Sequence, residues 1–188
     1  MFHRTHHLHQ PLHFACAYGA IEEVVEMLIA EDSNTILAQN NDNRTPLHFL
    51  MGNCDRHRSH SILDILLKTR PEVVNYVDKS GKLAIELLGI RAKDIDPNNE
   101  EARRNAMKCL TIYLNAKPDG CTELFTALQG LPNWLLDSAV VLPAVQKILN
   151  TKISEVCHSI FYFYFYFLPP PIQFILIDSS FMLLFRYP

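Results

Sequence analysis

Apolar residues recur at helical spacing in several stretches of the chain. The first stretch follows the i, i+3, i+4, i+7, i+8 spacing of a helix that buries one face, with Ile21, Val24, Val25, Leu28 and Ile29. Polar, turn-forming residues separate this stretch from later ones of the same kind. The pattern predicts amphipathic helices at residues 21–31, 61–69, 100–114 and 143–153.

A shorter motif stands before the first two of these helices. Its fuller copy is Thr45-Pro46-Leu47-His48, and Pro11-Leu12-His13-Phe14-Ala15-Cys16-Ala17-Tyr18-Gly19 is the other. Thr45 is suited to cap a helix N-terminus, and Pro46 fits the first helical position because its missing N–H has no helical partner there. Small Ala15 allows close approach of neighbouring helices, and Gly19 is suited to a left-handed helix end. Each motif therefore predicts a short inner helix, followed by one of the amphipathic outer helices.

The spacing between these helices indicates a repeated unit. From outer to next inner helix the step is 19 residues twice, from Leu28 to Leu47 and from Leu66 to Ile85. From inner to outer helix it grows along the chain, from 16 residues to 19 and then 25. A stacked array accepts insertions in this way, because the added residues fall into loops on one side. We therefore expect the insertions to form polar loops at residues 53–60 and 90–99.

The third unit departs from the motif. Lys82-Leu83-Ala84-Ile85-Glu86-Leu87 stands where the motif is due, and it keeps the apolar position but loses the Thr, the Pro and the His. Thr122–Leu128 echoes the motif again, with Leu124 only 14 residues after Leu110, and predicts a shortened unit or a cap. The predicted organisation is a His-rich terminus at 1–10, repeats at 11–42, 43–78 and 79–116, capping helices at 117–154 and a hydrophobic tail at 155–188.

The region from Pro11 to about Leu114 resembles the ankyrin-repeat family. The positions that carry the resemblance are Pro11, Leu12, His13, Ala15, Gly19, Thr45, Pro46, Leu47, His48 and Ile85. The resemblance implies an all-α solenoid of stacked helix pairs, whose inner helices and connecting fingers recognise other proteins. It brings no catalytic residue and no cofactor to this chain. We expect His13 and His48 to brace the fingers by hydrogen bonds.

The fingers are the predicted contact surface for a protein partner. The candidate binding residues are Asn41, Asp42, Asn43, Arg44, Asp78, Lys79 and Ser80. The leading hypothesis is a non-catalytic scaffold for protein–protein interaction. The alternative is a membrane protein in which the repeats are a cytosolic appendage to a C-terminal membrane segment.

Composition narrows the chemistry further. A net charge of −3 and a pI near 6.3 give no electrostatic reason to expect nucleic acid as a partner. The chain has no phosphate-binding loop, no His-Glu-x-x-His and no Gly-x-Ser-x-Gly. Five cysteines without a Cys-x-x-Cys indicate reduced thiols in the cytoplasm, and Cys54 falls in an insertion where we expect no rigid support. We expect no metal at the His-rich terminus, because a chain end does not fix ligand geometry.

The C-terminal tail has several interpretations. Residues 160–177 carry no formal charge over 18 positions, close to the length of a membrane span, but Pro169-Pro170-Pro171 interrupts any helix there. Phe161–Phe167 alternates Phe and Tyr, which is a strand period. The tail is a membrane-anchoring segment, an apolar low-complexity tail, or the translation of non-coding sequence. Only ten residues precede the first motif. We therefore expect that an N-terminal part of a longer array stands before Met1.

Overall fold

The computed structural model describes residues 10–116 and 121–136, several positions between 139 and 145, and two strands near the C-terminus. The chain divides into two compact units, Met1–Gln146 and Lys147–Pro188. Each unit is described by itself below. The His-rich N-terminus and the alternating Phe–Tyr segment lie outside the described residues, as does most of the helix expected at 143–153.

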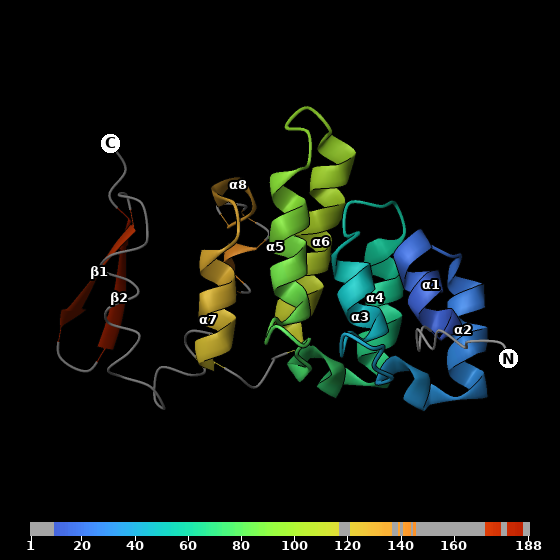
Figure 1. Cartoon of the computed structure of the whole chain (residues 1–188). Coiled ribbons are helices and arrows are strands. Elements are labelled where there is room, and N and C mark those ends of the chain that lie inside the picture. The colour runs from blue at the N-terminus through green and yellow to red at the C-terminus, as the bar shows by residue number, and fades with distance from the viewer. Residues whose placement is uncertain are drawn as a thin grey trace, which may run out of the picture. The chain divides into compact units, whose positions relative to one another are not determined.

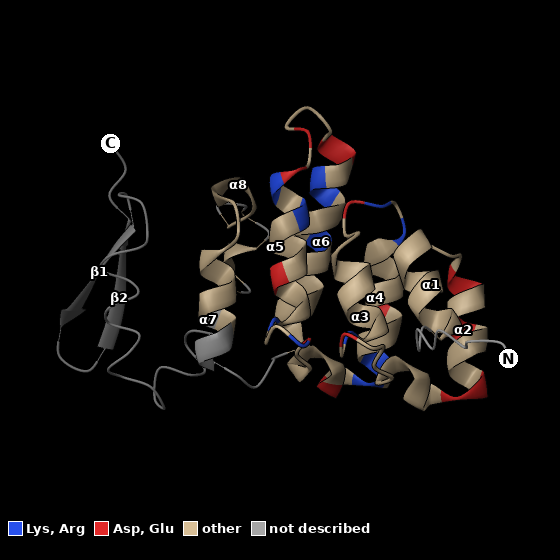
Figure 2. Ribbon diagram, in the orientation of Figure 1, with Lys and Arg blue, Asp and Glu red and all other residues tan. Residues whose placement is uncertain are grey.

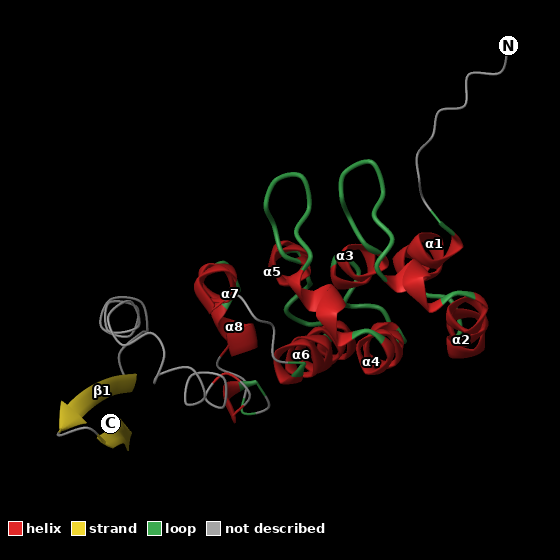
Figure 3. Cartoon of the chain, turned by 90° about the horizontal axis from the view of Figure 1, so that it is seen from below, coloured by secondary structure: helices red, strands yellow, loops and turns green. Residues whose placement is uncertain are grey.

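The first unit is built from three successive helix pairs. They are α1 (Pro11–Tyr18) with α2 (Glu22–Glu31), α3 (Pro46–Met51) with α4 (Ser59–Thr69), and α5 (Ala84–Lys93) with α6 (Glu100–Asn115). The helices α1, α3 and α5 form one row and α2, α4 and α6 a second row behind it (Figures 1 and 3). Short 3-10 helices follow the first two outer helices, η1 (Ser33–Ile36) after α2 and η2 (Pro71–Asn75) after α4. The described part of this unit is helical, which confirms the all-α class.

The helix ends follow from their residues. Pro11 and Pro46 occupy the first helical positions, and each is preceded by a residue in extended conformation. Gly19 ends α1 with a positive φ of 72°, a conformation that glycine adopts without steric cost. Asn99 starts α6 with its side chain, which accepts a hydrogen bond from the N–H of Ala102 at 3.0 Å.

The core lies between the two rows of helices and repeats with the helix pairs. The inner row buries Leu12, Leu47 and Ile85, while Ile62, Leu66 and Leu110 are buried in the outer row. Ile36 of η1 and Val74 of η2 are also buried, at the same place in successive units. The hydroxyl of Tyr113 on α6 donates to the Val74 carbonyl at 2.9 Å, which ties the third pair to the end of the second. The stack therefore consists of one interlayer core repeated three times.

The stack continues beyond the third pair. Helix α7 (Cys121–Gln129) packs on α5, and the short α8 (Asn133–Leu136) packs on α6, so both rows are extended by one helix (Figure 1). Gly89 of α5 makes the contact close, because a Cβ there would lie 2.8 Å from Cδ2 of Leu131. The guanidinium of Arg103 on α6 lies 4.7 Å from the ring centroid of Trp134 on α8.

Two loop predictions need correction. Residues 90–93 form the last turn of α5, which ends at Lys93. Ala92 in this turn is buried against the stack. The 53–60 insertion is not an unsupported loop. Its Ser59 hydroxyl donates to the Asn53 carbonyl at 2.7 Å, and Asn105 of α6 donates to the Asp55 carbonyl at 3.2 Å. The insertion is therefore held by the next helix pair.

The second unit contains an antiparallel hairpin of β1 (Ile172–Ile177) and β2 (Ser180–Phe185), with Ile172 opposite Phe185 and Ile177 opposite Ser180. The sequence analysis predicted an irregular apolar tail, whereas the structure has a β-hairpin in this region. Both segments are rich in Ile, Phe and Leu, which favour strands over turns. Within the described residues, no helix has the length and apolar character needed to cross a membrane.

Candidate functional site

Each of the two fingers between helix pairs folds around one side chain. In the first finger, Oδ1 of Asn40 accepts hydrogen bonds from the N–H groups of Asp42 and Arg44, both at 2.9 Å. In the second, Oδ1 of Asp78 accepts from the N–H groups of Ser80 and Lys82 at 2.8 and 3.1 Å. Such local bonds are the reason that Asn and Asp are common in turns. The tip of each finger is thereby fixed without a partner.

A residue with positive φ closes each tip. Asn43 has a φ of 57° in the first finger and Gly81 a φ of 75° in the second, three residues after Asn40 and Asp78 respectively. Asn and Gly adopt this conformation more readily than other residues. Asn43 therefore shapes its finger, and Asn40, which the sequence predictions did not single out, organises it. An Asn or Asp followed three residues later by Asn or Gly is the pattern that would have found both.

The two fingers are joined to each other. Nε of Arg44 donates to Oδ2 of Asp78 at 3.2 Å, and the N–H of Lys79 donates to the Asp42 carbonyl at 2.9 Å. Burial alone would raise the pKa of Asp78, but the N–H groups of Lys82 and Ser80 and the Arg44 guanidinium lower it below its ordinary value. The buried Asp78 side chain is committed to the fingers themselves. Asn41, Asp42, Asn43, Lys79 and Ser80 are the predicted contact residues that are exposed.

Two buried histidines connect inner helices to the fingers that follow them. His13 Nε2 lies 3.0 Å from the Arg44 carbonyl, and His48 Nε2 lies 3.3 Å from the Lys82 carbonyl. Nδ1 of His48 accepts from the N–H of Thr45 at 3.2 Å, and the Thr45 hydroxyl lies 2.9 Å from the same nitrogen. Because Nδ1 accepts, the proton of the neutral imidazole is on Nε2, which donates to the finger.

The inner helices present apolar side chains beside the fingers. Phe14, Phe49 and Leu87 occupy the same position on α1, α3 and α5, each one residue after the position of His13, His48 or Glu86. Phe14 is 49% exposed, and its ring stacks against Tyr18 with centroids 6.4 Å apart. Helices α1 and α3 contain no Asp, Glu, Lys or Arg, whereas charged residues lie on α2, on the fingers and toward the far ends of α5 and α6 (Figure 2).

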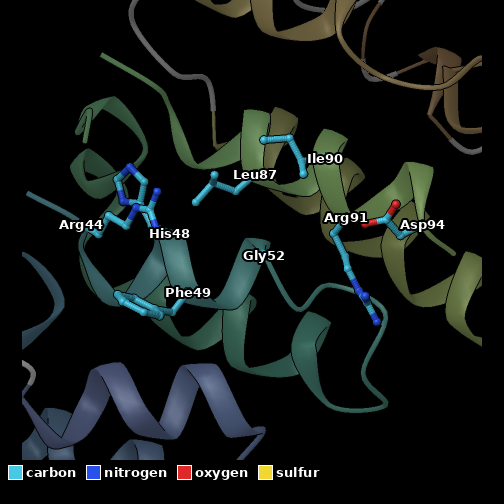
Figure 4. A pocket seen from close by; sticks show the side chains of 8 residues that line it. All are labelled: Arg44, His48, Phe49, Gly52, Leu87, Ile90, Arg91 and Asp94. Carbon is cyan, nitrogen blue, oxygen red and sulfur yellow. The ribbon is translucent and has the colours of Figure 1, made fainter. Parts of the chain in front are cut away.

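A groove of about 320 Å³ opens between α3 and α5 at this surface (Figure 4). Its residues are Arg44, His48, Phe49, Gly52, Leu87, Ile90, Arg91 and Asp94. Leu87 and Ile90 extend from α5 toward α3, where Gly52 leaves the opposite wall without a side chain (Figure 4). The groove is therefore apolar along its middle and charged at its two ends.

Comparison with known proteins identifies the architecture. A family model described as "Ankyrin repeat" matches residues 8–41, which include α1, α2 and η1. Residues 8–41 are therefore similar to an ankyrin repeat. No curated protein and no solved structure matches it. The match falls on the first repeat, and the second helix pair has the same proline start and the same histidine contact to the following finger.

The third helix pair replaces the motif residues but keeps part of their chemistry. Glu86 stands in the place of the histidine, and its Oε1 accepts from the N–H of Leu83 at 2.9 Å. His48 makes the equivalent bond to Thr45 with Nδ1. Ile85 is buried like Leu47, and Ala84 replaces the proline at the first helical position. The start of α5 is therefore satisfied by a different side chain in the same geometry.

The edge of the stack opposite the fingers carries an ion pair between successive helix pairs. Nε and Nη2 of Arg91 on α5 donate to the two oxygens of Asp55 at 2.9 and 2.7 Å. The hydrogen bonds from Arg91 are the main cause that lowers the pKa of Asp55, against the opposing effect of burial. This pair anchors the 53–60 insertion to the third repeat.

Cys16, Cys54 and Cys109 are buried thiols. Cys54, which was expected to lack rigid support, is fully buried, and Cys109 Sγ lies 3.7 Å from the Cys54 carbonyl. Burial raises the pKa of Cys54 to about 12 and raises those of Cys16 and Cys109 well above the ordinary thiol range, so the reactive thiolate is suppressed. Among the described residues, no cluster of His, Cys, Asp and Glu is arranged to hold a metal ion, and the N-terminal histidines lie outside them.

We predict that the stability of the stacked helix pairs decreases on mild acidification. Burial lowers the pKa of His48 below its ordinary 6.5, and the bond to Lys82 opposes this only in part. As pH falls below about 6.5, the unfolded chain takes up the proton before the folded one, so the free energy of unfolding decreases. Burial also lowers the pKa of His60, which adds a slope of the same sign.

Urea unfolding at pH 8, 7, 6 and 5 measures this effect. The midpoint should decrease between pH 7 and pH 5, and His48→Gln should reduce the decrease because glutamine does not titrate. An equal slope in the parent and in His48→Gln would show that His48 is not responsible.

Proposed function

We propose that this chain is a non-catalytic ankyrin-repeat scaffold that binds a protein partner across its two fingers and its inner helices. The observation that carries the proposal is the row of Phe14, Phe49 and Leu87 at one repeated position of α1, α3 and α5. Phe14 is exposed and Phe49 and Leu87 are half-buried, so three successive inner helices carry an apolar side chain that solvent reaches at the same position. Aromatic side chains are favoured at the centres of protein interfaces.

The rigidity of the fingers supports the same proposal. Asn40 and Asp78 hold the two tips, and Lys79 N–H binds the Asp42 carbonyl, so the tips are already ordered in the free protein. A partner that docks there does not have to order the loops, which removes one cost of association. The exposed side chains of Asp42 and Lys79 supply one negative and one positive charge at the tips. Such rim charges set partner choice and association rate more than affinity.

The proposal includes a reducing compartment such as the cytoplasm. Five cysteines without a paired spacing support this setting, and burial of Cys16, Cys54 and Cys109 fits their role as core residues.

Charge reversal at the finger tips tests the proposal. We expect the double variant Asp42→Lys, Lys79→Glu to capture at least tenfold less partner than the parent chain. Quantitative mass spectrometry after cross-linking measures the amount captured. Neither side chain takes part in the hydrogen bonds that fix the fingers, so the fold should be unchanged. Thermal unfolding verifies this.

A matched control is available on the outer row. Lys68 pairs with Asp64 on α4, away from the inner helices, and the swap Asp64→Lys, Lys68→Glu changes charge in the same way. The control should retain the partner. If the finger variant retains its partners as well as the control does, the fingers are not the binding surface.

A further inference from the structure

The groove between α3 and α5 differs from the rest of the inner surface in one respect, the absence of a side chain at Gly52. The equivalent positions on α1 and α5 are Ala17 and Ile90. Gly52 has a φ of −68°, so its backbone conformation does not require glycine. What glycine provides here is space.

That space faces the groove. A Cβ at residue 52 would meet the carbonyl oxygens of His48 and Phe49 at 3.4 and 3.7 Å, and these belong to its own helix segment. No atom of α5 lies within 4 Å of that Cβ position. Leu87 and Ile90 form the facing wall, and Ile90 is 50% exposed. An apolar side chain from outside therefore has an open floor and an apolar wall to contact.

The two charged ends of the groove are not equivalent. Arg91 uses Nε and Nη2 to bind both oxygens of Asp55, and Asp94 stands beside it in the groove lining, so that end has little uncompensated charge. Arg44 uses Nε alone to bind Asp78. No other described residue bonds its two terminal nitrogens, and its side chain is 38% exposed. The Arg44 end is therefore where a carboxylate finds free donors.

We propose that the groove binds an acidic peptide segment of the protein partner. The segment places a large aliphatic or aromatic side chain over Gly52 and a carboxylate on the terminal nitrogens of Arg44. Arg44 and Gly52 lie on either side of α3 (Pro46–Met51), whose six residues rise about 9 Å along the helix. An extended segment covers this distance in about three residues. The inference rests on the proposed function and names the chemistry of the partner.

Selection from a random peptide library tests this directly. Phage that display random 12-residue peptides are selected on the immobilised full-length chain, and fluorescence anisotropy measures the affinity of the enriched peptides. We expect enriched sequences to combine Asp or Glu with Leu, Ile, Met, Phe, Tyr or Trp at a constant spacing. Gly52→Leu, which fills the floor, and Arg44→Gln should each weaken binding at least tenfold. Glutamine keeps an N–H donor for Asp78, so the fingers retain a bond there.

Two control variants change similar chemistry elsewhere. Met27→Leu alters an exposed apolar side chain on α2, and Lys68→Gln removes a positive charge on α4; both should leave peptide binding unchanged. Enriched peptides without acidic residues, or peptides that bind Gly52→Leu as tightly as the parent chain, would overturn the inference. A library that gives no binder above an unrelated immobilised protein would overturn it too.

The same variants separate the groove from the proposed function. If Asp42→Lys, Lys79→Glu loses the cross-linked partner while Gly52→Leu and Arg44→Gln retain it, the scaffold function stands and the groove inference fails. If Gly52→Leu and Arg44→Gln lose both the peptide and the partner, both are supported.

Discussion

His48→Ala should lower the free energy of unfolding by about 2–4 kcal/mol, because it leaves buried hydrogen-bonding groups without partners. His48 is fully buried, and its ring accepts from the Thr45 N–H and donates to the Lys82 carbonyl. Alanine satisfies neither group and also leaves a cavity. Urea unfolding monitored by circular dichroism measures the loss.

Comparison of His48→Ala with His48→Gln separates the loss of the bond from the Thr45 N–H from the other losses at this position. His48→Gln should recover part of the loss, because its side-chain oxygen can accept from the Thr45 N–H as Glu86 does from Leu83. His57 is the control, since its side chain is 79% exposed and its replacement by alanine should cost less than about 0.5 kcal/mol. A loss at His48 as small as that at His57 would contradict a bracing role.

Gly89→Val is the second variant with a large expected effect. The first atom of any side chain at residue 89 would lie 2.8 Å from Cδ2 of Leu131 and 3.5 Å from the Gly130 carbonyl oxygen. Overpacking at such a contact costs about 1–3 kcal/mol. Glycine inside a helix is otherwise unfavourable, so with open space the same change would be neutral or stabilising. The sign of the effect therefore reports whether α7 and α8 are packed on the third repeat.

A second substitution tests the cause. Leu131→Ala removes the atom that valine meets, so the double variant Gly89→Val, Leu131→Ala should be less destabilised than the sum of the two single variants. Additive effects would indicate that the cost of Gly89→Val has another source.

The sequence was most informative where one residue type had one local task. Pro11, Pro46 and Gly19 predicted helix ends within a residue, because their backbone preferences act locally. The periodic apolar residues predicted the outer helices α2, α4 and α6 with small shifts at their ends.

Features that depend on contacts between repeats were harder to predict. The 53–60 insertion has a polar sequence, and nothing local shows that Arg91 and Asn105 from later helices hold Asp55. Cys54 has apolar neighbours only in space, so its burial was missed for the same reason. The groove depends on a side chain that Gly52 lacks, and a missing side chain becomes visible only when the facing helix is placed.

The histidine contacts give the array a direction. His13 donates to the second repeat's Arg44 carbonyl and His48 to the third repeat's Lys82 carbonyl, so support passes from each repeat to its successor. Glu86 stands at the next equivalent position, and its side chain has no N–H to donate. The contact of α5 with the next inner-row helix is the packing of α7 on it. The third helix pair therefore differs from the first two in the bond by which a pair supports its successor.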